Sequence, residues 1–308
     1  MTDPADLDAG EAPRDPEELD ASGAAEGEIS PGAHPGPVHL TVADLERSIG
    51  YYREQIGLEP VERNGVRASI GTPERTLLVL TEEPGARPAD GFTGLYHFAL
   101  LVPERVQLAR WLAHAGRDRV PMTGLSDHFV SEALYLRDPD GHGIEIYWDR
   151  PRGVWEGQVM ERMTTLPLNV QSLLGELDDP ATEPFDGLPA GTVMGHVHLR
   201  VAEIESTVAF YRDALGFGLM AQLGPQAAFL AAGGYHHHLG ANIWESAGAP
   251  PPEPGMAALR HATIELPDEA ARADVVARAE AAGVEVEEDE HGPRVTDPSG
   301  NSFVLEVP

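Results

Sequence analysis

The sequence predicts an α+β protein in which four βαβββ modules form two open cup-shaped barrels. An internal repeat is the first observation behind this prediction. The segment that begins at Val38 matches the segment that begins at Val197, and the RDPDG turn ending at Gly141 matches the TDPSG turn ending at Gly300. Both pairs lie 159 residues apart. One fixed offset across separate blocks indicates a duplicated unit.

The second observation is that each half contains the same order of elements twice. After Val38 the apolar residues alternate, and from Asp44 they follow helical spacing up to Gly57, which is placed to end the helix. Short apolar runs bounded by turn residues, such as TLLVL and ALYL, then predict further strands. The four modules are therefore expected at residues 36–82, 94–150, 193–245 and 258–308.

The composition divides the chain further. Residues 1–34 are rich in acidic residues, Ala, Gly and Pro and are predicted to be a disordered acidic tail. Two modules would make a first domain at 35–150 and two more a second domain at 193–308. Residues 151–192 would form the linker, with a short helix near NVQSLLGEL.

The charge and the residue content exclude several classes of function. A net charge of −30 would repel nucleic acid and anionic membranes, so neither is expected as a partner. The chain shows no long apolar segment and no signal-peptide pattern, and we expect it in the cytoplasm. A homo-oligomer is compatible with the sequence. The absence of Cys leaves His, Asp and Glu as the ligands for any metal.

Strand alternation identifies the side chains that face away from the helices. In the opening strands of the second, third and fourth modules these include His97, His196 and His261, whereas the first module has Pro37 at the leading position. In the closing strands the same face carries Glu145 in the second module. In the fourth module Val304 occupies the equivalent position, and Glu306 lies two residues further on.

These motifs resemble those of the vicinal oxygen chelate superfamily, which includes glyoxalases, bleomycin resistance proteins and extradiol dioxygenases. The resemblance rests on the opening strands GHVHLRV and LYHFALLVP, on SDHFVSEALYLRDPDG and on the closing strand DPDGHGIEIYW, and it extends from about residue 36 to 308. More narrowly, the motifs are similar to those of catechol 2,3-dioxygenases.

The resemblance implies that two His and one Glu hold a divalent metal, with Fe(II) expected and Mn(II) as the alternative. Pairing of the second and third modules would give His196, His97 and Glu145. Pairing of the third and fourth would give His196, His261 and Glu306. We favour the first set because Glu145 is in register with its turn. We also expect the histidines that face away from the helices to approach one another across only one pair of modules.

The resemblance also implies catalytic roles outside the metal ligands. It selects His238, from the run His236, His237 and His238, as the residue that transfers protons, and it suggests that His128 contacts substrate or oxygen. Tyr147 and Trp244 could form walls for an aromatic ring. The expected substrates are a small aromatic diol and O2. The alternatives are a glyoxalase-type isomerase and a metal-free protein that binds small molecules.

Overall fold

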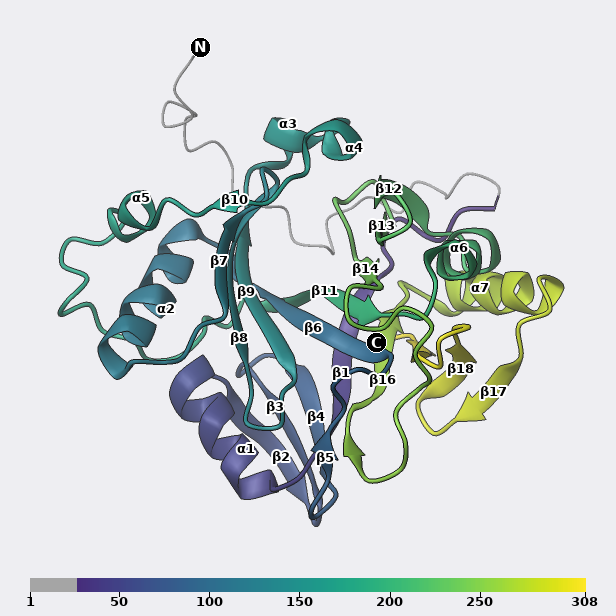
Figure 1. The fold of residues 1–308 in the computed structure, drawn as a ribbon, viewed down its shortest axis with the longest axis horizontal. Coiled ribbons are helices and arrows are strands. Elements are labelled where there is room, and N and C mark those ends of the chain that lie inside the picture. Colours follow the sequence, from purple (N-terminus) through teal and green to yellow (C-terminus); the bar gives the residue numbers. More distant parts are fainter. Residues whose placement is uncertain (1–26) are drawn as a thin grey trace.

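The computed structural model describes residues 27–308, and four βαβββ modules account for most of them (Figure 1). The first module contains β1 (His34–Val42), α1 (Leu45–Tyr51), the π-helical turn η3 (Tyr52–Ile56), β2 (Glu59–Asn64), β3 (Arg67–Gly71) and β4 (Thr76–Glu82). The second contains β6 (Gly94–Leu101), α2 (Arg105–Asp118), β7 (Gly124–Asp127), β8 (Ser131–Arg137) and β9 (Gly143–Asp149).

The second half of the chain repeats this order. Its first module contains β11 (Val193–Arg200), α6 (Ile204–Val208), the π-helical turn η4 (Ala209–Ala214), β12 (Gly218–Leu223), β13 (Ala227–Ala231) and β14 (Leu239–Asn242). The last contains β16 (Leu259–Glu265), α7 (Glu269–Ala281), β17 (Val286–Asp289), β18 (Gly292–Thr296) and β19 (Ser302–Glu306). Short strands β5 (Arg87–Pro88) and β15 (Met256–Ala257) pair with each other.

Each large sheet combines modules from both halves of the chain. The first and fourth modules form an eight-stranded sheet in the order β17-β18-β19-β16-β1-β4-β3-β2. The second and third form most of a nine-stranded sheet in the order β10-β7-β8-β9-β6-β11-β14-β13-β12. Both sheets are mixed and curled, which confirms the predicted α+β class and its four modules.

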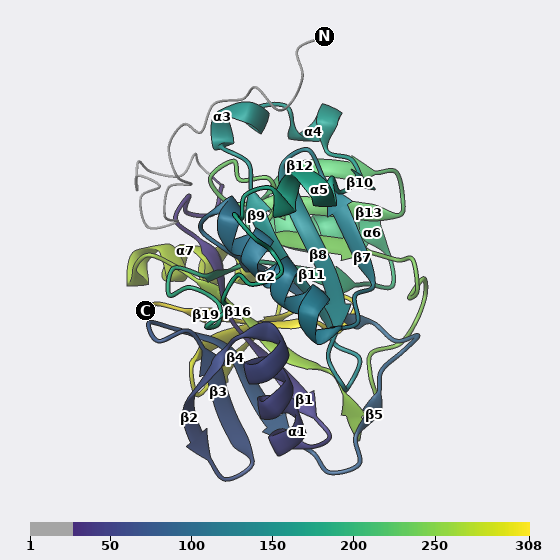
Figure 2. The ribbon, with the colours of Figure 1, turned by 90° about the vertical axis from the view of Figure 1, so that its left-hand side faces the viewer.

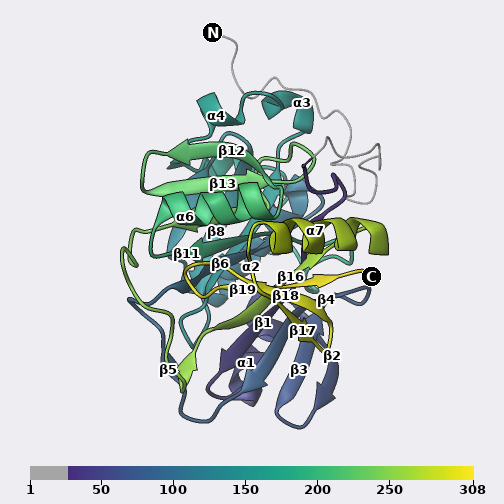
Figure 3. The same ribbon diagram turned by 90° about the vertical axis from the view of Figure 1, so that its right-hand side faces the viewer.

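The helices cover the outer faces of the curled sheets. Helix α2 packs against β9 and lies in front of the larger sheet in Figure 2, and α6 lies beside β13 in Figure 3. The apolar face of each sheet packs on its helices, so the opposite, concave face is left for polar side chains. No helix within residues 27–308 is long and apolar enough to cross a membrane.

The first helix illustrates how local sequence defines these elements. The Asp44 carboxylate caps α1 by accepting a hydrogen bond from the Arg47 backbone N–H at 3.0 Å. Gly57 follows the helix with φ of 88°, a conformation that favours glycine. The predicted start and end of this helix are both confirmed.

The linker packs against both modules of the larger sheet. Helices α3 (Arg152–Trp155) and α4 (Val159–Arg162) bury Trp155 and Val159 against Phe229 of β13 and Val130. Strand β10 (Leu166–Pro167) then pairs with β7, and α5 (Val170–Leu174) forms the short helix expected there.

The acidic tail predicted for residues 1–34 lies mostly outside the described residues. Its last part, from residue 27, differs from that prediction. Ile29 is buried and its N–H donates to the Gly216 carbonyl at 2.9 Å, while His34 begins β1. An apolar side chain thus anchors this segment, although its neighbours are acidic and small.

Gly143 lies where β6 and β9 approach each other closely, and a substitution there tests this approach. A Cβ at this position would lie 2.0 Å from the Tyr96 carbonyl oxygen of β6. We expect Gly143→Ala to lower the free energy of unfolding by about 1–3 kcal/mol, because the backbone must shift. Gly116→Ala in α2 is the control: its Cβ meets nothing within 4 Å, so it should stabilise by roughly 0.5–1 kcal/mol. Urea unfolding measures both, and equal stabilities would contradict this prediction.

Candidate metal centre

Three buried side chains converge on the concave face of the larger sheet. His97 of β6 and His196 of β11 each place Nε2 3.0 Å from the Glu145 Oε2 of β9. The two Nε2 atoms are 3.3 Å apart. Three potential ligand atoms therefore surround one small volume.

Strand register explains this convergence. Glu145 and His196 both lie opposite Ala99, on either side of β6, so the three residues form one row across the sheet. His97 lies two residues before Ala99 and therefore faces the same side. The Ala99 methyl group is small enough to leave the space above it to the longer side chains on either side.

The electrostatics of the cluster favour a carboxylate beside neutral imidazoles. Burial by itself would raise the pKa of Glu145, but the adjacent His196 and His97 imidazoles hold that pKa well below its usual range. Burial lowers the pKa of His196, and the Glu145 carboxylate opposes this effect. Glu145 is thus ionised at neutral pH and available as an anionic ligand.

The residues present fit a divalent metal ion. Within the part of the chain that the structure describes, His97, Glu145 and His196 are the one group of His, Asp and Glu whose ligand atoms all lie within 4.8 Å of one another. Two imidazoles and one carboxylate are a donor set typical of non-haem Fe(II) sites. The remaining ring nitrogen of His196, Nδ1, is buried without a hydrogen-bond partner.

A cavity of about 570 Å³ opens beside this group. Its walls include aromatic and imidazole rings from both halves of the chain: Tyr96, Tyr135, His198, Phe229, His237 and Trp244. The Trp244 ring is 48% exposed and lies 5.5 Å from that of Tyr96, so it stands at the rim. Tyr147 is fully buried behind His196 and is not part of the wall.

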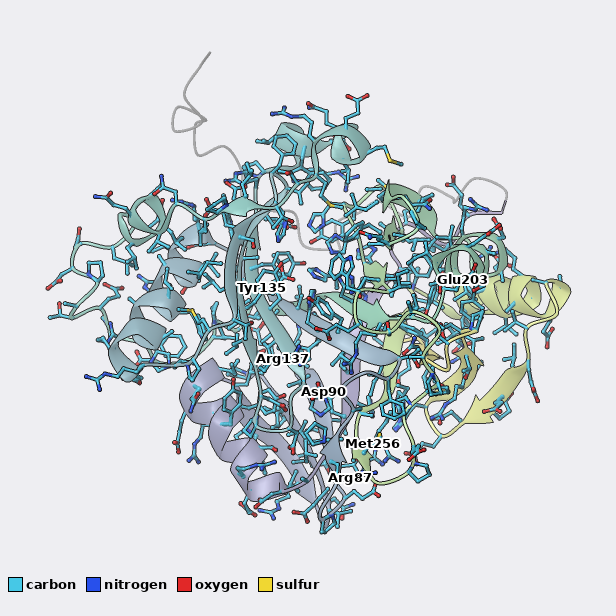
Figure 4. The ribbon with its side chains drawn as sticks, in the orientation of Figure 1. Arg87, Asp90, Tyr135, Arg137, Glu203 and Met256 are labelled. Atoms are coloured by element: carbon cyan, nitrogen blue, oxygen red, sulfur yellow. The ribbon has the colours of Figure 1, made fainter. Side chains whose placement is uncertain are left out.

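Tyr135 and His128 form a polar part of the cavity wall. Tyr135 lies directly opposite Glu145 on the neighbouring strand, and Figure 4 shows it on β8 toward the centre of the molecule. Its hydroxyl is 2.7 Å from His128 Nε2, while His128 Nδ1 donates to the Thr164 carbonyl at 2.8 Å. Burial and the nearby Glu145 carboxylate raise the pKa of Tyr135 well above its usual value, so the phenol stays protonated.

The His236–His238 run does not follow strand alternation, because β14 begins only at Leu239. In this loop His237 lines the cavity, with its ring centroid 4.1 Å from that of His196. His238 points away from the cavity wall: its Nδ1 accepts from the Ala232 N–H at 3.1 Å and its ring stacks on Tyr235. The selection of His238 over His237, which the resemblance implied, therefore does not agree with this geometry.

Burial lowers the pKa of His237 well below its usual value, and the neighbouring imidazoles of His196 and His236 add to the effect. His237 is therefore neutral at neutral pH. A neutral imidazole at a cavity wall can accept a proton from a ligand.

The alternative ligand set is not brought together. His261 lies on β16 and Glu306 on β19, both in the eight-stranded sheet, whereas His196 belongs to the nine-stranded one. Pro37 and Val304 occupy the positions equivalent to His196 and Glu145 there.

The smaller sheet nevertheless holds a histidine pair of its own. The rings of His39 and His261 stack with centroids 3.9 Å apart, so the expectation that histidines meet across only one pair of modules is wrong. Burial first, and then neighbouring imidazoles and Arg side chains, lowers the pKa of His39 to about 2. Burial and Arg294 lower that of His261 to about 4.

Several cavity residues were not selected from the sequence. Tyr135 occupies an inward position in ALYL, and its alternation could have found it beside Glu145. Strand alternation puts Ala99 on the same face as His97, but the importance of its small side chain depends on which strands flank it. The orientation of His237 depends on the conformation of a loop, which no periodic pattern in the sequence predicts.

Comparison with known proteins relates both halves of the chain to one family. Residues 34–146 and 193–305 match the family described as Glyoxalase/Bleomycin resistance protein/Dioxygenase superfamily. The Catechol-2,3-dioxygenase of Bacillus subtilis (strain 168) is 40% identical over 282 residues, which cover 89% of this chain and 97% of that protein.

Solved structures share the fold at lower identity. Glyoxalase I from Zea mays superimposes with a TM-score of 0.55 at 18% identity, over 89% of this chain and 92% of its own. A Bacillus subtilis structure (strain 168) has a TM-score of 0.60 at 15% identity, over 89% of this chain and 84% of its own.

Proposed function

Because the chain belongs to the glyoxalase/bleomycin resistance protein/dioxygenase superfamily, we propose that it is a metal-dependent extradiol dioxygenase acting on a catechol-like diol. The cluster of His97, Glu145 and His196 beside a cavity with aromatic walls is the observation that carries this proposal. The identity of 40% with a catechol-2,3-dioxygenase, over nearly all of that protein, supports it.

We assign the metal site to His97, His196 and Glu145, with Fe(II) as the metal and Mn(II) as the alternative. Three ligands leave coordination positions for other groups. When bound, such a metal would supply a Lewis-acidic centre that chelates a diol and conducts electrons between the ring and dioxygen. The Glu145 carboxylate would offset part of the positive charge of the metal. The strands β6 and β11 hold the buried rings of His97 and His196 in place.

His237 is the residue we assign to proton transfer. It lines the cavity next to His196 and is neutral, so it can accept a proton from a diol hydroxyl and later return it to the product. Because the Tyr135 phenol donates its proton to His128 Nε2, its hydroxyl oxygen can accept a hydrogen bond from a diol hydroxyl in the same space. These two side chains would thus stand on different sides of the reacting oxygens.

The cavity is suited to an aromatic ring with an apolar substituent. A volume of about 570 Å³ falls in the range that holds drug-sized ligands, which exceeds a single ring. Leu223, Phe229 and Met163 contribute apolar side chains to its lining. The reaction balances without a further reductant: one ring C–C bond breaks, and both atoms of O2 enter the product.

Catechol cleavage by the reconstituted enzyme tests the proposed activity. Under anaerobic reconstitution with Fe(II), followed by addition of O2, we expect a yellow ring-opened product from catechol and a higher kcat/KM for catechols that carry an apolar substituent. Each equivalent of product should consume one of O2. Isomerisation of a hemithioacetal without uptake of O2 would contradict the proposed reaction.

The repeat supplies a matched pair of variants for the metal site. His97 and His261 occupy equivalent opening-strand positions, yet only His97 faces Glu145 and His196. We expect His97→Ala to lose most of the bound Fe(II), because two ligands rarely retain a divalent ion. His261→Ala should keep roughly the wild-type content. Elemental analysis after desalting measures both, and equal metal contents would place the site elsewhere.

His237 and His238 provide a second matched pair of variants. His237→Asn should keep the metal and lower kcat by roughly two to four orders of magnitude, as expected when a general acid–base group is lost. His238→Asn should have a much smaller effect, because that side chain does not reach the cavity. Steady-state kinetics with metal analysis separates them. A larger loss in His238→Asn would restore His238 as the proton-transfer residue.

A further inference from the structure

We propose that Asp149 and His236 are positioning residues that fix the tautomer of His237, so that its Nε2 lone pair faces the cavity. This inference rests on the proposed function only in the role given to His237. The hydrogen bonds that support the inference are observed in the fold and do not depend on the proposed function.

The three side chains form a continuous buried chain. Asp149 Oδ1 lies 2.8 Å from His236 Nε2, and His236 Nδ1 lies 2.8 Å from His237 Nδ1. The exposed fractions are 4% for Asp149, 0% for His236 and 8% for His237. Asp149 ends β9, four residues after Glu145, so the same strand carries a metal-site residue and the start of this chain.

The positions of the protons follow from the donors and acceptors. An ionised carboxylate only accepts, so His236 Nε2 carries the proton that it donates to Asp149. As part of this proposal His236 is a neutral imidazole, so its Nδ1 has a lone pair and the His237 Nδ1–H donates to it. A neutral His237 is consequently left with an unprotonated Nε2, which is the form that accepts a proton from a ligand.

The surroundings hold the chain in place and keep water away. The Trp155 ring of the linker packs edge-on against His236 with centroids 5.4 Å apart. The Tyr235 hydroxyl donates to the other Asp149 oxygen, Oδ2, at 2.7 Å, and the Tyr147 hydroxyl lies 2.8 Å from that of Tyr235. Both oxygens of Asp149 are therefore engaged, and the carboxylate cannot rotate without losing a buried hydrogen bond.

The arrangement resembles in logic the Asp that orients the His of a serine protease, where the carboxylate selects the imidazole tautomer. Here one imidazole stands between the carboxylate and the reacting imidazole. Asp149 and His236 should therefore affect turnover through the orientation and tautomer of His237, with little effect on substrate binding.

The test reads the tautomer directly. In metal-free protein labelled with ¹⁵N-histidine, long-range ¹H–¹⁵N spectra report which ring nitrogen carries the proton, and the His237→Asn variant assigns the His237 signals. We expect the proton of wild-type His237 on Nδ1. A proton on Nε2 would overturn the proposal, whatever the activity of the enzyme.

Variants then connect the tautomer with turnover. His236→Phe keeps a ring but removes both nitrogens, so His237 should shift toward the Nε2–H form. In Fe(II)-loaded enzyme kcat should fall by roughly 10- to 1,000-fold, with KM for catechol changed by less than about threefold. His238→Asn is the matched control, because His238 lies in the same loop but its Nδ1 bonds the Ala232 N–H instead of the chain to His237, so the tautomer should be unchanged.

Asp149→Asn provides a second route if His236→Phe does not fold, and it should shift the tautomer in the same direction. A changed tautomer with unchanged kcat would refute the positioning role. If wild-type enzyme loaded with metal cleaves no catechol, the proposed function fails, while the tautomer of His237 still tests the arrangement of Asp149 and His236.

Discussion

The antiparallel pairing of β6 with β11 is the constraint on which the candidate site depends. This pairing joins the two halves of the chain, and its register sets His196 beside Ala99. The parallel pairing of β6 with β9 sets Glu145 on the other side of the same residue. Because side chains on a strand alternate, a shift of one residue in either pairing would turn a ligand toward the helices.

The smaller sheet shows what remains when the same architecture lacks its ligands. Strands β1 and β16 pair as β11 and β6 do, and they bring His39 and His261 into a stack. Pro37 and Val304 stand where the larger sheet has His196 and Glu145, so no carboxylate faces these imidazoles from the equivalent position. Burial and the neighbouring Arg and His side chains then disfavour protonation of both rings, and Asp289 opposes this effect only in part at His261, which is consistent with their lowered pKa values.

The linker contributes to the site although it belongs to no module. Trp155 packs against His236, and Thr164 accepts a hydrogen bond from His128. Met163 and Thr165 line the cavity. The segment that joins the two halves thus closes the space between the second and third modules, where β6 and β11 meet. A chain of buried hydrogen bonds from Asp149 to His237 lies beneath this cover.

The sequence by itself determined the modules, their boundaries within a few residues and the faces of their strands, because periodicity of two or about four residues is a local property. It therefore placed His97, His196, Glu145 and His261 on concave faces. Only the tertiary structure decided which modules share a sheet, since strand pairing between distant segments leaves no mark on local spacing. It also determined that His237, and not His238, lines the cavity, because a loop with Gly233 and Gly234 at positive φ follows no alternation.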